Sequence, residues 1–141
     1  MRMSPRPLAV LGLITLATSL SACGRASSTG VGAGIKQLAS ISAEGALMAD
    51  DVARQRSKVT FVRVHGAELS AQAEHEAEKL NDDPVAPKLK QPIHTAIELS
   101  ADISGAIDDL RVSPQDRGQA RESEHKLLHW AAEAGKLAES L

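Results

Sequence analysis

The five histidines of this 141-residue chain, with the carboxylates near them, are the residues best suited to bind a metal ion or exchange a proton near neutral pH. Glu122, His125 and His129 follow one another at spacings of three and four residues, which on a helix places a carboxylate and two imidazoles on one face. These groups are ligands for zinc and similar metals. On such a helix they lie opposite Leu127 and Ala134, so we expect a solvent-exposed face. A metal-binding function through these three residues is therefore the alternative hypothesis.

The sequence around the other three histidines gives weaker indications of a metal-binding or catalytic role. His75 opens a His-Glu-x-x-His pattern, but the fifth position is Lys79, whose ammonium group cannot replace an imidazole ligand at neutral pH. We expect His65 and His94 to flank apolar helix faces. The chain has no Gly-x-Ser-x-Gly motif, and it has a single cysteine, Cys23. We therefore expect a protein that is not an enzyme, with no catalytic residues and no cofactor.

The first 22 residues have the organisation of a secretory signal. Residues 1–7 carry two arginines and no acidic residue, and residues 8–20 are almost entirely apolar. This apolar stretch is shorter than the roughly twenty residues that cross a bilayer as a helix. No arginine pair occurs in this segment, so we expect the general secretory route and not the twin-arginine route.

The signal ends in Leu20-Ser21-Ala22-Cys23, an aliphatic residue, two small residues and then the cysteine. This sequence resembles the lipobox of bacterial lipoproteins. The resemblance covers only the processing segment, and it implies that the sulfur of Cys23 carries a diacylglyceryl group and that the chain is cleaved before Cys23. Acyl chains contribute about 0.8 kcal/mol of membrane binding for each buried CH₂ group. The implied location is the cell membrane, with the protein lipid-anchored on the extracytoplasmic side.

Charge and aromatic content limit the partners of the processed chain. Residues 1–22 hold two of the sixteen basic residues and none of the eighteen acidic ones, so their removal changes the formal net charge from −2 to −4. An acidic chain with 1% aromatic residues is not expected to bind nucleic acid. Anionic headgroups do not attract it either. Arg54, Arg56, Lys58 and Arg63 would be distributed around a continuous helix, so we expect them to be ordinary solvated residues.

The remaining sequence predicts an all-α fold. We expect residues 1–22 to be the signal peptide, residues 23–34 the lipidated cysteine and a flexible tether rich in Gly and Ser, and residues 35–141 a small bundle of three to four helices. Residues 59–64 have the composition of a strand. Because no other segment offers a partner strand, we expect a helix there as well.

Apolar and small residues recur at helical spacing from Ile35 to Leu80, with Gly45, Gly66 and, further on, Gly105 as sites of close helix approach. One rod of this length would span roughly 69 Å, which helices over residues 92–111 and 114–141 cannot cover. Either the segment breaks near residues 55–58, which we favour, or another chain covers part of one long helix. We expect the helical segment that contains Leu80 to end at Asn81, which would be its cap.

Two further expectations concern the last helix and the function. Ser113 is the expected N-cap of that helix, with Pro114 at its first position and Trp130 as the one large inward-facing side chain. The function that these features predict is a non-enzymatic lipoprotein that binds a partner protein, associates with itself or associates with the cell envelope. An uncovered apolar stripe over residues 35–52 is the expected docking face.

Overall fold

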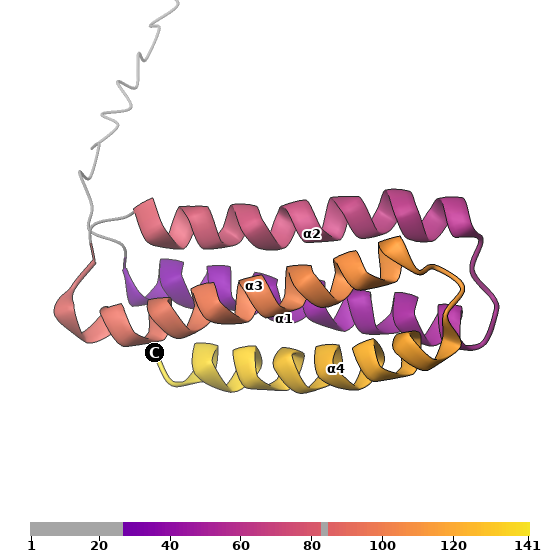
Figure 1. The fold of residues 1–141 in the computed structure, drawn as a ribbon. Helices are drawn as coiled ribbons and strands as arrows, with labels where there is room; N and C mark the ends of the chain where they lie inside the picture. The colour runs from indigo at the N-terminus through magenta and orange to yellow at the C-terminus, as the bar shows by residue number, and fades with distance from the viewer. Residues whose placement is uncertain (1–26, 83–84) are drawn as a thin grey trace, which may run out of the picture.

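The computed structural model describes residues 27–82 and 85–141, which form four helices and one short 3₁₀ turn. The helices run alternately up and down in an antiparallel bundle (Figure 1). The expected all-α bundle is therefore confirmed, including the break after the first helix and the helix over residues 59–64. The elements are α1 (Ser28–Ala53), α2 (Val59–Asp82), η1 (Pro87–Leu89), α3 (Lys90–Val112) and α4 (Arg117–Glu139).

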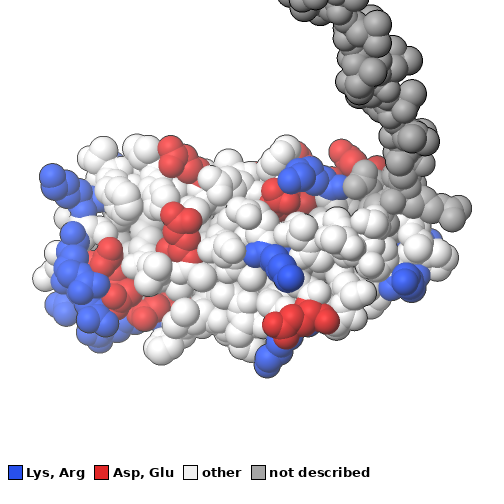
Figure 2. All heavy atoms as spheres, turned by 180° about the vertical axis from the view of Figure 1, so that it is seen from behind, with Lys and Arg blue, Asp and Glu red and all other residues white. Residues whose placement is uncertain are grey.

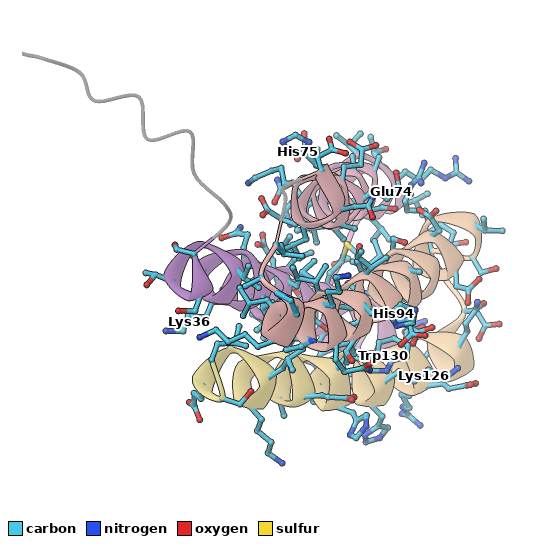
Figure 3. The ribbon with its side chains drawn as sticks, turned by 90° about the vertical axis from the view of Figure 1, so that its left-hand side faces the viewer. Lys36, Glu74, His75, His94, Lys126 and Trp130 are labelled. Carbon is cyan, nitrogen blue, oxygen red and sulfur yellow. The ribbon has the colours of Figure 1, made fainter. Side chains whose placement is uncertain are left out.

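The helices pack as two tight pairs, α1 with α4 and α2 with α3. Viewed along the bundle, α2 and α4 lie at opposite corners, and α1 and α3 lie between them (Figure 3). The apolar stripe of α1 is consequently covered by the rest of the bundle: Ile35, Leu38 and Ile41 are almost completely buried. The expectation that residues 35–52 offer a docking face is wrong, because α4 covers α1 along its length.

Small residues allow this close packing. A Cβ atom on Gly45 would lie 3.2 Å from Cδ1 of Ile107 and 3.3 Å from Cδ1 of Leu127, so α1 is in contact with both α3 and α4 at this point. A Cβ atom on Gly66 would lie 2.7 Å from Cγ of Arg111. Gly105, in contrast, is exposed with no atom within 4 Å of such a Cβ, so the expectation of close approach is wrong there.

The largest fully buried side chains are aliphatic. Trp130 is only partly buried: it packs against the edge of the core, on the side of α4 that is turned toward α3 (Figure 3). Trp130 thus faces inward as expected, but it is not the main anchor of the core. The core instead depends on leucine and isoleucine side chains interleaved with alanine, which is consistent with the two aromatic residues in the whole chain.

Two buried serines connect the helices within each pair. The hydroxyl of Ser42 on α1 donates a hydrogen bond of 2.7 Å to the carbonyl oxygen of Leu127 on α4. Likewise, the hydroxyl of Ser100 on α3 donates a bond of 2.7 Å to the carbonyl oxygen of Ala73 on α2. Such short side chains reach a neighbouring backbone only where two helices approach closely. Each bond therefore satisfies a buried polar group and fixes the register of its pair.

The first helix begins earlier than the sequence predicts. Ser27 is its N-cap, and its hydroxyl accepts a hydrogen bond of 3.1 Å from the backbone N–H of Gly30. Residues 28–34 are thus helical, and the expectation of a flexible tether is wrong for them. The low helix propensity of glycine is offset by packing, because Val31 is buried and Gly32 lies close to Ala138 of α4. Residues 23–26 of the expected tether and the expected signal peptide lie outside the described residues.

The fourth helix begins later than expected, at Arg117. The carboxylate of Asp116 caps it by accepting hydrogen bonds from the backbone N–H groups of Gly118 and Gln119, at 2.9 and 3.0 Å. Ser113 instead ends α3 by donating its backbone N–H to the carbonyl oxygen of Asp109. Because Asp116 satisfies two donors of the helix start, the expected N-cap at Ser113 is wrong.

Two other boundaries differ by a few residues. The second helix continues through Asn81 to Asp82, so the expected cap at Asn81 is wrong. The third helix begins at Lys90 and not at Pro92, directly after the 3₁₀ turn. A proline in the first turn removes no hydrogen bond from a helix, so Pro92 does not mark the first residue.

The turn after α1 contains neither glycine nor proline. The backbone N–H of Arg56 donates to the carbonyl oxygen of Asp51 at 2.8 Å, and that of Gln55 to the carbonyl oxygen of Val52 at 3.0 Å. This pair of bonds defines a Schellman motif, in which the residue at the Gln55 position is usually glycine. Gln55 adopts the required left-handed conformation with φ of 59°. A non-glycine residue there is strained by roughly 1–2 kcal/mol.

We expect Gln55→Gly to raise the free energy of unfolding by about 0.5–1 kcal/mol, because the relieved strain exceeds the entropy that glycine loses on folding. Urea denaturation followed by circular dichroism measures this change. Gln72→Gly is the matched control, since Gln72 is exposed in the middle of α2, where glycine costs about 1 kcal/mol. If Gln55→Gly and Gln72→Gly both lowered the free energy of unfolding, the left-handed conformation of Gln55 would be contradicted.

Candidate interaction surface at the loop end of the bundle

The end of the bundle at which α1 and α3 finish and α2 and α4 begin is named here the loop end, and it includes residues 54–58 and 113–116. Basic side chains gather over this end, with acidic ones among them (Figure 2). All six arginines of the described residues lie in this half of the bundle: Arg54, Arg56, Arg63, Arg111, Arg117 and Arg121. Arg54, Arg56, Lys58 and Arg63 are exposed, as expected, but they are not distributed around one helix because the helix breaks among them.

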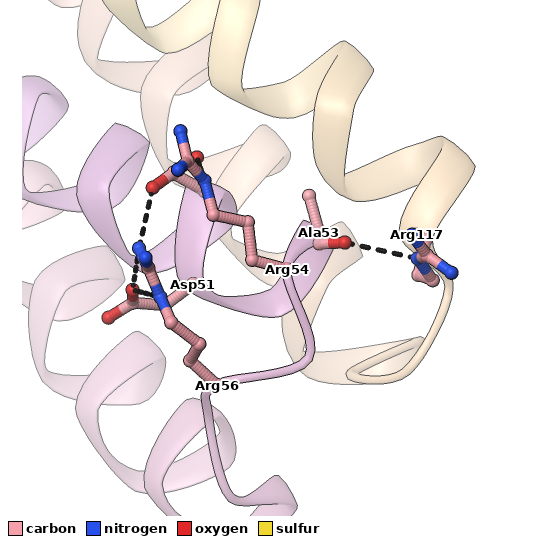
Figure 4. Close-up of polar contacts among 6 residues, drawn as sticks. Asp51, Ala53, Arg54, Arg56 and Arg117 are labelled. Carbon is pink, nitrogen blue, oxygen red and sulfur yellow. Dashed lines mark hydrogen bonds and ion pairs between the residues drawn. The ribbon is translucent and has the colours of Figure 1, made fainter.

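Two aspartates near the end of α1 are paired with the arginines of the turn (Figure 4). Nε of Arg54 donates to Oδ1 of Asp50 at 2.6 Å, and Nη2 of Arg56 donates to Oδ2 of Asp50 at 2.9 Å. Arg56 also donates to Oδ1 of Asp51, at 2.7 Å from Nη2 and 3.0 Å from Nε. The hydrogen bond to Asp51 raises the pKa of Arg56. Both carboxylates are thereby engaged by guanidinium groups.

Arg117 joins the start of α4 to the end of α1. Its Nε donates a hydrogen bond of 3.1 Å to the carbonyl oxygen of Ala53, the last residue of α1 (Figure 4). Carbonyl groups at a helix C-terminus lack partners within the helix, and a positive charge there is favoured by the helix dipole. This contact therefore brings arginines from two distant parts of the sequence to one place on the surface.

An open cavity of about 480 Å³ lies between the last turn of α1 and the first turns of α4. Charged and polar residues dominate its lining, which consists of Asp50, Ala53, Arg54, Arg121, Glu124 and His125. Arg54 uses only its Nε toward Asp50, and Arg121 makes no hydrogen bond or ion pair with another of the described residues. The guanidinium N–H groups that remain can therefore bind a ligand in this cavity.

The candidate metal ligands of the sequence lie on the exposed outer face of α4, as expected. Oε1 of Glu122 lies 2.6 Å from Nζ of Lys126, and this hydrogen bond lowers the pKa of Glu122. Nε2 of His129 lies 3.7 Å from Oε2 of Glu133, while His125 lines the cavity. Within residues 27–82 and 85–141, no group of three or more His, Cys, Asp or Glu residues could hold a metal ion. The structure thus does not assemble Glu122, His125 and His129 into a metal centre.

The other histidines are each close to a carboxylate. Nε2 of His65 lies 2.9 Å from Oε1 of Glu44, across the interface between α1 and α2. The ring of His65 also stacks on Phe61, with 5.0 Å between the ring centroids. His75 and His94 lie near glutamates of their own helices on the exposed surface. His65 is therefore the histidine that contributes to helix packing.

Cys23, the expected lipidation site, lies outside the described residues. In the part of the chain that the structure describes, none of the helices has the length and apolar character needed to cross a membrane. No protein-family model, no curated protein and no solved structure matches this chain.

Proposed function

We propose that this protein is a bacterial lipoprotein, anchored through Cys23 to the cell membrane, whose helical bundle is a non-enzymatic protein-interaction module on the extracytoplasmic side. The observation that carries this proposal is the sequence Leu20-Ser21-Ala22-Cys23, placed directly after a basic and then an apolar segment. The loop end supports the interaction part of the proposal, because it presents unused hydrogen-bond donors on an accessible surface.

The start of α1 determines how far the bundle can lie from the anchor. Four residues separate Cys23 from Ser28, the first residue of α1. A chain extends by at most about 3.6 Å per residue, so the Cα atoms of Cys23 and Ser28 are within about 18 Å of each other. On this proposal, the bundle end that contains Ser28 and Leu141 is held near the lipid headgroups (Figure 1).

The loop end lies at the far end of α1 from this attachment. A helix of 26 residues, the length of α1, spans about 39 Å. The arginines are therefore separated from the anchor by the length of the bundle, which leaves them accessible to a partner protein. Since the processed chain is acidic, the acyl chains and not the protein surface would provide the attraction to the membrane.

The test of the anchor is Cys23→Ser in the full chain, expressed in bacteria that are fed a labelled fatty acid. We expect the unaltered protein to carry the label and to sediment with membranes, and Cys23→Ser to lose both properties, because a hydroxyl group does not replace the thiol that is acylated. Ser21→Ala retains a small residue at its position and should behave as the unaltered protein does. An unlabelled wild-type protein, or a Cys23→Ser variant that still sediments with membranes, would refute the anchor.

A further inference from the structure

We propose that the loop end binds an acidic segment of the partner protein, with Arg54 and Arg121 as the residues that bind its carboxylates. This inference deepens the proposed interaction function by giving the chemistry of the partner. It rests on that function only for the existence of a protein partner, because the surface itself is a property of the described bundle.

The cavity offers hydrogen-bond donors of two arginine side chains. The Nη groups of Arg54 and all the donors of Arg121 are unused within the described residues, and both side chains line the cavity of about 480 Å³. Arg117, which joins α4 to α1 beside them, bonds to the described part of the chain through its Nε alone. A guanidinium group presents its N–H donors in a planar fork that matches the two oxygens of a carboxylate.

The neighbouring acidic residues do not neutralise these donors completely. Among residues 27–82 and 85–141, Asp50 accepts one bond from Arg54 and one from Arg56, and Asp51 accepts bonds from Arg56 alone. Glu124 is the remaining carboxylate in the lining. An incoming carboxylate therefore meets two arginines with unused donors. The cavity also contains two carboxylates, Asp50 and Glu124, which limit how many further negative charges it accepts.

The charge of the rest of the bundle favours a short acidic segment over a long polyanion. The described residues contain 13 basic and 17 acidic residues, and acidic side chains are concentrated at the far end of α2: Glu74, Glu76, Glu78 and Asp82. An extended anionic polymer would be repelled along the surface outside the loop end. A short segment held at the loop end avoids that repulsion. In protein complexes, too, charged groups of one partner face groups of opposite charge on the other.

The test measures binding of a fluorescent eight-residue peptide of alternating Glu and Gly to the full chain in detergent at low ionic strength. We expect the double variant Arg54→Gln with Arg121→Gln to bind roughly tenfold more weakly or worse, because two charge-assisted contacts are lost. Lys88→Gln with Lys90→Gln is the matched control, since it removes the same charge from exposed residues at the opposite end. This control should bind nearly as well as the unaltered protein. Added salt should weaken the binding.

Three results would overturn the inference. They are equal binding of a peptide with Gln in place of Glu, an equal loss in the lysine control, and no binding of the acidic peptide at millimolar concentration. If inorganic phosphate displaces the peptide from these arginines and binds more tightly than the peptide does, the site is a phosphate site. That result would also refute an acidic protein segment as the ligand. Cys23→Ser should retain peptide binding, so failure of the membrane anchor and failure of this inference can be told apart.

Discussion

Replacing Leu127 by alanine is expected to lower the free energy of unfolding by about 3–4 kcal/mol. Leu127 is completely buried on α4, where it lies against Gly45 of α1. The loss combines the transfer free energy of the removed carbon atoms with the cost of a cavity that the surrounding helices cannot close. The carbonyl oxygen of Leu127 still accepts the hydrogen bond of Ser42, so the backbone of α4 stays in place and the cavity remains. Urea denaturation followed by circular dichroism measures the change.

The neighbouring residue provides the control for this prediction. Leu128 has 50% of its surface exposed, and Leu128→Ala should change the free energy of unfolding by no more than about 0.5 kcal/mol. The two variants have the same chemistry at adjacent positions, so their difference reports which face of α4 is turned inward. Similar losses from both, or a larger loss at Leu128, would contradict the orientation of α4.

Replacing Gly45 by leucine is expected to lower the free energy of unfolding by about 3 kcal/mol, the upper part of the usual range for an overpacked core. The first carbon atom of the new side chain would already lie 3.2 Å from Ile107 and 3.3 Å from Leu127. The three carbon atoms that follow have no space between α1, α3 and α4 unless the helices move apart. Thermal unfolding should show a lower midpoint and, through the separated helices, a less cooperative transition.

Gly105→Leu is the matched control for the Gly45 variant. Gly105 is exposed within α3, and a Cβ atom there would meet nothing within 4 Å. Because leucine is a better helix former than glycine, this variant should gain about 0.5–1 kcal/mol. If Gly45→Leu were as stable as Gly105→Leu, then α1 would not approach α3 and α4 as closely as the structure shows.

The helices and most of the core could be predicted from the sequence because burial imposes a period of 3.6 residues. Leu38, Ile41, Ile103 and Ile107 follow that period, and all four are buried. The break after α1 could also be predicted, although no glycine or proline marks it. Two shorter helices cannot cover one long rod, so the lengths of the helices favour a break even though the composition around Gln55 does not mark one.

The helix ends could not be predicted as well, because contacts with distant residues decide them. Ser113 and Asp116 are both good N-caps, and local preference does not choose between them. In the structure Arg117, the residue that follows Asp116, also bonds to the end of α1. At the start of α1, composition favours a tether, whereas the helix is extended by burial of Val31.

The arginine surface could not be predicted for a related reason. Arg54 and Arg121 are far apart in the sequence, and nothing in their local sequence indicates that they line one cavity. The prediction would have required knowledge that α1 pairs with α4. The periodicity of a helix shows which of its faces is buried, but it does not show which helix covers that face.

The pairing of the first helix with the last also determines the order in which the bundle can fold. Because α2 and α3 lie between α1 and α4 in the sequence, the pair of α1 and α4 forms only when a long loop closes. The pair α2 and α3, in contrast, is joined by a short connection and can form a local hairpin early. Closing the bundle requires Ala53 and Arg117 to meet across the whole hairpin, so a chain in which α1 and α4 have not yet paired exposes the apolar face of α1. Packing of α4 against α1 is therefore the step that covers this apolar face.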